Sequence, residues 1–343
     1  MEKQEKVKNI RELAALLNLS ITTVSRVLNG KAKLYRISKS TSDRVFEAAH
    51  NLQYTPNRIA RGLKMEKSET LGLIVPDISN PFFASIARTI EIEARKKGYS
   101  LLYCDSMEDE NSEKELIQLM VSRKVDGLII APVGSESIHI DDIIKQQTPV
   151  LVIDRYFPKK TISYITTDNH LGAFKAVEYM IQCGHRNIAC IQGIPHTSPN
   201  IDRMQGYKDA LKRYDIPFHE ELIIGTDFGE ENGYISTKHL MSKPSKPTAI
   251  FAFSNLIALG AIRAANELKL QIPDQMSLLS FDEQPYSAFL ACPLSTIEQK
   301  KEAIAVLAVD HLLKIINGEL KDSLTSIKIA PSLIIRDSVK KIT

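Results

Sequence analysis

From Leu71 onward, short apolar runs alternate with segments of helical periodicity, and this alternation limits the possible folds more than any other feature of the sequence. The first runs, each as short as a buried strand, are LGLIV, SLLYC, GLIIA and PVLVID, and helical patterns lie between them near residues 82–97, 111–123 and 140–147. The alternation restarts around Tyr164 with the runs NIACIQ, ELIIG, TAIFAF and MSLLSF. Alternating strands and helices form parallel sheets covered on both faces, so the sequence predicts an α/β fold with two similar subdomains.

A ligand cleft is expected between these subdomains. Ligands of open α/β sheets bind beyond the carboxyl ends of the strands. The predicted cleft is therefore lined by segments near 76–83, 104–106, 154–156, 193–203, 254–255 and 282–286.

Residues 9–30 have the pattern of two short helices joined by a tight turn. Asn9 and Glu12 resemble a capping box, Asn18 tolerates the left-handed backbone of a turn, and Ser20 is a helix N-cap residue. The first helix has an apolar stripe of Ile10, Leu13, Ala14 and Leu17. Together these signals predict a helix-turn-helix.

The second of these helices has a polar face of Thr22, Ser25, Arg26 and Asn29. Side chains of this kind read base edges and phosphates when a helix lies in the major groove of DNA. The same face also fits an ordinary solvated helix, and the pattern alone leaves both interpretations open.

The charge distribution favours the DNA-binding interpretation. Residues 1–67 contain 14 Lys and Arg but 6 Asp and Glu, a net charge of +8, and no carboxylate lies between Glu12 and Asp43. The remaining residues have a net charge of −5, so the +3 of the whole chain conceals the contrast. A basic segment on an acidic body is typical of nucleic-acid binding.

A basic loop, KAKLYRISKS, follows Gly30 and leads into a third predicted helix, for which Ser40 and Asp43 are the expected start signal. Three small helices around one apolar centre predict an all-α helix-turn-helix domain. The next segment, NRIARGLKMEK, is weakly helical because Gly62 lowers its helix propensity. The residues alone favour a flexible linker over the alternative, a helix that orders on DNA with Leu63 inserted into the minor groove.

Composition excludes several classes of protein. The 343 residues suffice for two or three domains, and no run of apolar residues is long enough to span a membrane. The first residues, MEKQEKVK, lack the apolar core of a signal peptide, and the four cysteines have no CxxC spacing. We therefore expect a cytoplasmic protein with reduced thiols.

The sequence contains none of the nucleotide-binding, hydrolase or zinc-protease motifs GxGxxG, GxxxxGK[ST], GxSxG and HExxH. Its eight histidines show no spacing of a metal site. We predict no enzymatic activity, no catalytic residue, no metal and no cofactor.

The chain resembles, over essentially its full length, the lactose/galactose-repressor (LacI/GalR) family of bacterial transcription factors. The motifs that carry the resemblance are SITTVSRVLNG, YTPNRIARGL, GLIVPDISNPFFA, DGLIIAP, GHRNIACIQG, RMQGY, SFDE and STIEQ, in this order. The resemblance implies two Rossmann-like subdomains of the periplasmic-binding-protein type behind the helix-turn-helix. It further implies a cytoplasmic, nucleoid-associated homodimer that binds a pseudo-palindromic operator in double-stranded DNA and responds to a small molecule in the cleft.

The resemblance also assigns roles to individual residues. In the recognition helix it implies base contacts from Ile21, Thr22 and Arg26 and phosphate contacts from Ser20, Thr23, Ser25 and Asn29. In the hinge helix it implies Asn57, Ala60 and Leu63, with Leu63 in the minor groove, which reverses the linker interpretation above. At the effector site it implies Phe82, Phe83, Asp154, Arg155, Arg203, Ser254, Asn255 and Asp282.

The effector is expected to be a carbohydrate, because an arginine and an aspartate can each bind a vicinal pair of hydroxyl groups. Two departures from the family pattern bear on this. Ser254-Asn255 stands where the family usually has Asn-Asp, which removes a carboxylate, and Arg155 leaves room for an acidic sugar or a sugar phosphate. The basic loop is about three residues longer than usual, so contacts from Lys31 to Tyr35 are not transferred.

The predicted domains are a helix-turn-helix at 1–55, a hinge at 56–69 and an effector-binding and dimerisation domain at 70–343. The last divides into one subdomain at 70–163 plus 295–325 and another at 164–294 plus 326–340. We predict a repressor of carbohydrate uptake or catabolism genes. Two binding proteins remain as rivals: a periplasmic sugar-binding protein, which needs a signal peptide and no basic head, and a non-specific DNA binder, which has no ligand cleft.

Overall fold

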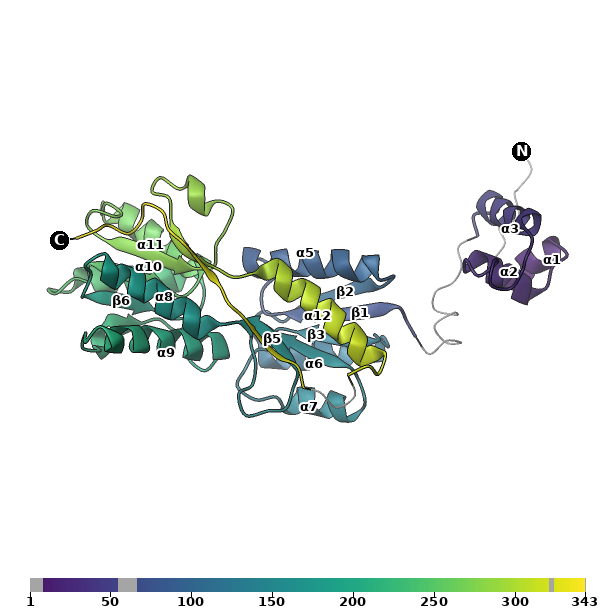
Figure 1. Ribbon diagram of the computed structural model, residues 1–343, viewed down its shortest axis with the longest axis horizontal. Helices are drawn as coiled ribbons and strands as arrows, with labels where there is room; N and C mark the ends of the chain where they lie inside the picture. The colour runs from purple at the N-terminus through teal and green to yellow at the C-terminus, as the bar shows by residue number, and fades with distance from the viewer. Residues whose placement is uncertain (1–8, 55–66, 321–323, 343) are drawn as a thin grey trace. The chain divides into compact units, whose positions relative to one another are not determined.

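The computed structural model describes residues 9–54, 67–320 and 324–342. Contacts within the chain divide it into two units, Met1–Ser68 and Glu69–Thr343 (Figure 1). Each unit has its own hydrophobic core, so each is treated by itself below.

Residues 9–54, the part of the smaller unit described up to its gap, form three helices, α1 (Ile10–Leu16), α2 (Ile21–Leu28) and α3 (Lys39–Asn51). Its core consists of Leu13, Ala14, Leu17, Val24, Val27, Val45 and Ala49. These residues recur at helical spacing on the three helices, which is why the apolar stripes of the sequence meet in one centre.

The helix-turn-helix signals are confirmed. The side-chain oxygen of Asn9 accepts the backbone N–H of Glu12 at 3.1 Å, and its amide donates to the Glu12 carboxylate at 2.8 Å. Asn18 has a φ of 56°, and the hydroxyl of Ser20 accepts the Thr23 N–H at 3.0 Å. Both helix starts therefore have the caps that the residue types predict.

The predicted start of the third helix is wrong by two residues. Ser38 is the N-cap, and its hydroxyl accepts the backbone N–H of Thr41 at 3.1 Å. Ser40 already lies inside α3, and Asp43 lies beyond its first turn. Ser38 takes this role because it has the extended backbone of an N-cap residue, with φ −62° and ψ 151°.

The first sheet of the larger unit is parallel throughout, in the order β11-β5-β4-β3-β1-β2. Its strands are β1 (Thr70–Val75), β2 (Ser100–Asp105), β3 (Gly127–Ile130), β4 (Val150–Ile153), β5 (Tyr164–Thr167) and β11 (Ser326–Ile329). On one face pack α5 (Pro81–Lys96) and α12 (Lys301–Ile316), and on the other α6 (Glu110–Ser122) and α7 (Ile138–Lys145) (Figure 1). Both faces are thus buried, as the continuous apolar strands predict.

The second sheet has the order β12-β10-β9-β8-β6-β7 and is parallel except for β12, which pairs antiparallel with β10. Its strands are β6 (Ile188–Ile191), β7 (Ile223–Ile224), β8 (Ala249–Ala252), β9 (Ser277–Phe281), β10 (Ser295–Glu298) and β12 (Ser332–Ile334). Its helices are α8 (Asn169–Gln182), α9 (Ser198–Arg213), α10 (Glu230–Ser242) and α11 (Asn255–Glu267), with short 3-10 turns at Glu220–Leu222 and Ser287–Phe289.

The chain passes between the two sheets three times: between β5 and α8, between β10 and α12, and between β11 and β12 (Figure 1). These crossings correct the predicted subdomain boundaries. The strand at 164–167 and the strand at 326–329 belong to the first sheet, and the strand at 295–298 belongs to the second. The sequence shows where strands lie, but the hydrogen-bonded partner decides the sheet, and Ile165 pairs with Ile153 of β4.

No helix in the described ranges is long and apolar enough to span a membrane.

Helices α10 and α11 approach each other backbone to backbone at two glycines. A Cβ atom on Gly260 would lie 1.9 Å from the carbonyl oxygen of Glu230, and one on Gly233 would lie 2.0 Å from that of Ile257. Neither neighbour is a flexible side chain, so the two helices would have to separate to admit even a methyl group.

We predict that Gly260→Ala lowers the free energy of unfolding by about 1–3 kcal/mol, because the added methyl group overpacks this contact. Chemical denaturation of the purified protein measures the change. Asn266→Ala, on the exposed side of the same helix, is the control and should have little effect. Equal stability of Gly260→Ala and wild type would contradict the close packing.

Candidate functional site

The smaller unit presents the first turn of α2 to solvent. Ile21 is 46% exposed although it is apolar, and Thr22 beside it is exposed. Arg26 lies one turn further along and is partly buried. Its guanidinium carbon stands 3.7 Å from the centre of the Tyr35 ring, which belongs to the loop after α2. The family resemblance implies base contacts from Ile21, Thr22 and Arg26, and these three residues lie on the same helix.

The residues with implied phosphate contacts lie at the two ends of α2. Ser20 and Thr23 share a hydroxyl–hydroxyl hydrogen bond of 2.8 Å at the helix start. At the helix end, the Asn29 amide donates to the Ser25 carbonyl oxygen at 2.7 Å. Ser20 and Asn29 thus also cap the helix, a role that the sequence predicted for Ser20 alone.

The hinge positions Asn57, Ala60 and Leu63 lie outside the described residues, so their assigned roles remain predictions.

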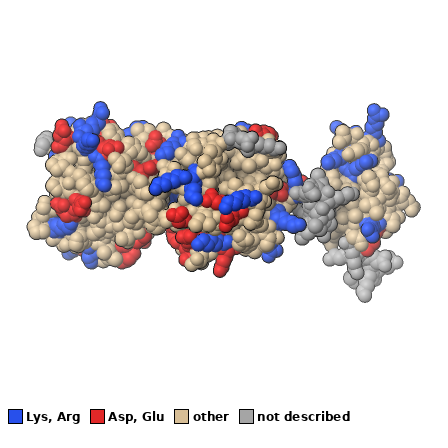
Figure 2. Space-filling model, turned by 90° about the horizontal axis from the view of Figure 1, so that it is seen from below, with Lys and Arg blue, Asp and Glu red and all other residues tan. Residues whose placement is uncertain are grey.

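Charged side chains are distributed differently over the two units. Blue and red side chains alternate over the visible face of the larger unit, whereas blue predominates on the visible face of the smaller one (Figure 2). Residues 31–39 alone carry Lys31, Lys33, Arg36 and Lys39. The smaller unit therefore combines exposed hydrogen-bonding residues with the positive charge that attracts phosphates.

The larger unit contains a cavity of about 240 Å³ at the carboxyl ends of strands from both sheets. Seven of the eight predicted effector residues line it: Phe82, Phe83, Asp154, Arg155, Arg203, Ser254 and Asp282. Asn255, the eighth, is buried behind the wall, and its amide lies 3.5 Å from the side-chain oxygen of Asn80, which does line the cavity.

The other residues of the cavity wall were not singled out from the sequence, although Asp77, Asn80, Ile194 and Pro199 lie within the predicted cleft segments 76–83 and 193–203. These other residues are Asp77, Asn80, Glu108, Ile194, Pro199, Asp227, Phe228, Gly229, Leu256 and Gln299. Most follow a strand, so a search of every carboxyl end, including that of β7, would have found Asp227 and Phe228. Gln299 ends the motif STIEQ, and Asn80 begins NPFF.

Asp154 and Asp282 follow β4 and β9 in an unusual backbone conformation, with φ values of 61° and 74°. Aspartate tolerates this left-handed region better than most residues. Backbone strain of this kind is concentrated at functional sites. Here the conformation turns each carboxylate out of its strand at the edge of the cavity.

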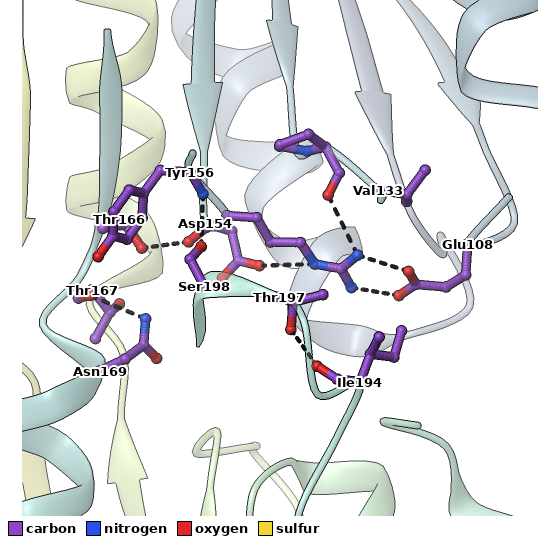
Figure 3. A network of polar contacts seen from close by, with 12 residues as sticks. Glu108, Val133, Asp154, Tyr156, Thr166, Thr167, Asn169, Ile194, Thr197 and Ser198 are labelled. Atoms are coloured by element: carbon purple, nitrogen blue, oxygen red, sulfur yellow. Dashed lines mark hydrogen bonds and ion pairs between the residues drawn. The ribbon is translucent and has the colours of Figure 1, made fainter. Parts of the chain in front are cut away.

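Arg155 is held between the carboxylates of Glu108 and Asp154, both of which are labelled in Figure 3. Its terminal nitrogens donate to both oxygens of Glu108, one at 2.7 Å, and its Nε lies 4.0 Å from Asp154. Burial opposes the charge of Arg155, but Glu108 and Asp154 outweigh that cost and raise the pKa of the guanidinium. The positive charge of Arg155 is therefore already matched inside the protein.

Asp154 is a fully buried carboxylate whose charge is only partly compensated. Burial raises its pKa to about 6, while Arg155 and Arg203 act in the opposite direction and Asp282 adds to the increase. A carboxyl group with such a pKa changes charge just below neutral pH.

Arg203, in α9, is buried against the second sheet. Its Nε donates to Asn169 at 2.8 Å, another nitrogen donates to the carbonyl of Phe253, and its guanidinium carbon lies 3.7 Å from the centre of the Phe281 ring. Burial lowers the pKa of Arg203, and the attraction of Asp282 opposes this effect. Arg203 is thus buried although it lies near the start of α9.

Two buried polar atoms at the cavity have no hydrogen-bond partner within the described protein: Nε of Arg155 and the side-chain oxygen of Asn255. Such atoms cost free energy unless a ligand pairs with them. In the described ranges, no cluster of three His, Cys, Asp or Glu residues is arranged to hold a metal ion. The cavity thus offers carboxylates, which accept hydrogen bonds from hydroxyl groups.

Two family models match the chain. Residues 9–57 match the bacterial regulatory proteins of the lacI family, and residues 177–339 match the periplasmic binding protein-like domain. The chain is 31% identical over 330 residues to the ribose operon repressor of Haemophilus influenzae, which covers 96% of this chain and 98% of the relative.

Two solved structures show the same fold. One is the lac repressor dimer bound to operator and the anti-inducer ONPF, with a TM-score of 0.86, 24% identity, and coverage of 97% of this chain and 99% of that one. The other is a LacI family transcriptional regulator from Enterococcus faecium with bound ribose, with a TM-score of 0.73, 26% identity, and coverage of 80% and 100%.

We predict that Asp154→Asn changes how stability depends on pH. Because the folded protein binds the Asp154 proton more tightly than the unfolded chain does, the contribution of Asp154 to the stability of wild type falls as the pH rises from about 4 through 6. The asparagine variant lacks this loss, so its stability relative to wild type should increase by on the order of 2 kcal/mol between pH 4 and pH 7. Urea unfolding of both proteins across this range measures the difference, and a constant difference would indicate an ordinary pKa.

Proposed function

The chain belongs to the lacI family of bacterial regulatory proteins, and from this premise we propose that it represses transcription from an operator and is released or recruited by a small sugar in its cavity. The observation that carries the proposal is the cavity wall, in which five carboxylates and two guanidinium groups from both halves line the same space. The helix-turn-helix supplies the DNA-binding half of the function.

DNA recognition requires both base contacts and phosphate contacts. We assign the base contacts to Ile21, Thr22 and Arg26, which belong to α2. We assign the phosphate contacts to Ser20, Thr23, Ser25 and Asn29. A dimer binds two half-sites about one helical turn apart, so the operator of a symmetric dimer is pseudo-palindromic. We propose a homodimer acting on double-stranded DNA in the bacterial cytoplasm.

The cavity is suited to a neutral polyhydroxylated ligand. Five carboxylates line it against two guanidinium groups: Asp77, Glu108, Asp154, Asp227 and Asp282 against Arg155 and Arg203. Carboxylates accept hydrogen bonds from hydroxyl groups, and the phenylalanines of the wall can cover the apolar face of a sugar ring. The volume of about 240 Å³ lies below the ~300–1,000 Å³ of sites for drug-sized ligands, which favours a monosaccharide.

An acidic sugar or a sugar phosphate is disfavoured. Arg155 was the residue that left room for an anion, but its terminal nitrogens are occupied by Glu108. An anionic ligand would have to displace that carboxylate while facing the remaining ones, and like charges at short distance repel strongly in a buried site. The relationship to a ribose operon repressor makes ribose the first sugar to test.

Ligand binding can be coupled to DNA binding through the two halves of the larger unit. Asp154 and Arg155 follow the first sheet, whereas Arg203 and Asp282 belong to the second, so one ligand in contact with all four holds the halves in one arrangement. Any ligand that binds one arrangement more tightly shifts the population toward it. By linkage, operator DNA then changes the affinity for the ligand by the same factor.

Other classes of function fit the chain less well. The relatives are transcriptional regulators, and we propose no enzymatic step for this protein. A periplasmic sugar-binding protein would not need the basic helix-turn-helix unit, and a non-specific DNA binder would not need a buried cavity with unpaired polar atoms.

We predict that selection from a random duplex pool enriches a two-fold-symmetric site, because two identical recognition helices read it. Arg26→Ala should weaken binding to that site by about 1–3 kcal/mol and relax the preference at one base pair of each half-site. Titration of labelled duplexes at fixed salt measures both. Enrichment of no site, with only salt-sensitive affinity, would support the non-specific DNA binder.

We predict that ribose raises the melting temperature of wild type and shifts its operator affinity, whereas ribose 5-phosphate does neither, because the cavity wall is acidic. Asp282→Asn should lose the ribose response and keep its operator affinity without ribose. Asparagine is chosen because it tolerates the φ of 74° at this position. The matched control is Asp215→Asn, also at a positive φ but outside the cavity wall, and a ribose response in Asp282→Asn at unchanged concentration would reject the assigned site.

A further inference from the structure

The loop between α2 and α3, which is longer than the family pattern, is an ordered turn. The backbone N–H of Tyr35 donates to the carbonyl of Lys31 at 3.2 Å, and that of Ile37 donates to Ala32 at 2.9 Å. Arg36 closes the turn with a φ of 53°. Ala32 and Ile37 pack against the three-helix core and so attach the turn to the rest of the unit at both ends.

This turn carries Tyr35 to the side chain of Arg26. The Tyr35 ring is 45% exposed and does not belong to the core, yet the Arg26 guanidinium carbon stands 3.7 Å from its centre. At this distance the cation is in contact with the ring, which attracts it. Within the described ranges, Arg26 takes part in no ion pair. The Tyr35 ring is therefore the main contact of the Arg26 guanidinium.

A stacked guanidinium keeps its hydrogen-bonding edge free. The ring covers one face of the planar group, whereas the N–H donors lie in the plane and point away from the ring. Those donors are the ones that bind O6 and N7 of guanine in the major groove. An unsupported arginine would lose much side-chain freedom on forming such contacts, and the ring restricts that freedom before DNA arrives.

We propose that Tyr35 is a positioning residue for DNA recognition, which holds Arg26 in the orientation that reads a G·C base pair. The proposal rests on the function proposed above, in which Arg26 contacts a base. Through Tyr35, the longer loop would contribute to sequence specificity. The lysines and the arginine of the loop do not, because charges that bind phosphates carry no sequence information.

The test compares operator binding by wild type, Tyr35→Ala, Tyr35→Phe, Tyr35→Leu, Arg26→Ala and the Tyr35→Ala/Arg26→Ala double variant. Each full-length protein is titrated with the selected operator and with operators altered at single base pairs, over a range of salt concentrations. Circular dichroism shows whether each variant is folded. Since Tyr35 is nearly half exposed, its replacement should leave the smaller unit folded.

We expect Tyr35→Ala and Tyr35→Leu to weaken operator binding about 5- to 30-fold, with the preference lost at the same base pair as in Arg26→Ala. Tyr35→Phe, which retains the ring, should bind like wild type. In the Arg26→Ala background, removal of Tyr35 should have no further effect, and the salt dependence should stay unchanged because no phosphate contact is lost.

Any of the following results would overturn the proposal. If Tyr35→Ala weakens operator binding equally in the wild-type and Arg26→Ala backgrounds, or if Tyr35→Phe also weakens operator binding, then Tyr35 contacts the DNA itself. If Tyr35→Ala binds more tightly, the ring sequesters Arg26. If Tyr35→Ala has the operator affinity of wild type while Arg26→Ala loses its base preference, Tyr35 has no role in recognition but the proposed function stands. If Arg26→Ala also keeps the affinity and base preference of wild type, both the role of Tyr35 and the proposed role of Arg26 are rejected.

Discussion

The three passages of the chain between the two sheets are the constraint on which the larger unit depends. Side chains at the passages are joined to one another: Thr167 donates to Gln299, which donates to Asp282 in the cavity wall. Lys328, beside the third passage, contacts both the Tyr156 hydroxyl at 2.9 Å and Asp202 at 3.2 Å. Three connecting segments permit one half to rotate about the other but prevent the halves from separating. Such a rotation is the motion that a cavity lined by both halves requires.

The cavity concentrates buried charge at the point where the halves meet. A buried charge is costly unless it is paired, and the pairing here is incomplete. Glu108 matches Arg155, but Asp154 is left with a pKa of about 6, and the Nε of Arg155 has no hydrogen-bond partner. A ligand with several hydroxyl groups would form hydrogen bonds with the Asp154 carboxylate and the Nε of Arg155. Because these bonds form only when the ligand is bound, they can favour one arrangement of the two halves.

In the smaller unit, the same residues serve structure and recognition. Ser20 and Asn29 cap the two ends of α2, and together with Thr23 and Ser25 they lie where phosphates are expected. The apolar stripes bury Leu13, Val24 and Val45 in one small core, so the opposite face of α2 is left for DNA. The ordered turn after α2 adds an aromatic ring to that face.

The sequence by itself determined the elements and their chemistry, because helix periodicity, caps and apolar strand runs are local properties. It located the helix-turn-helix, the strands, and seven residues of the cavity wall, the last through family motifs. Only the tertiary structure decided that the strands at 164–167 and 326–329 join the first sheet, that Glu108 neutralises Arg155, and that Tyr35 stacks on Arg26. Each of these depends on the partner that a strand or side chain meets after folding. Glu108 and Arg155 are 47 positions apart, and nothing in the local sequence around either residue predicts that they pair.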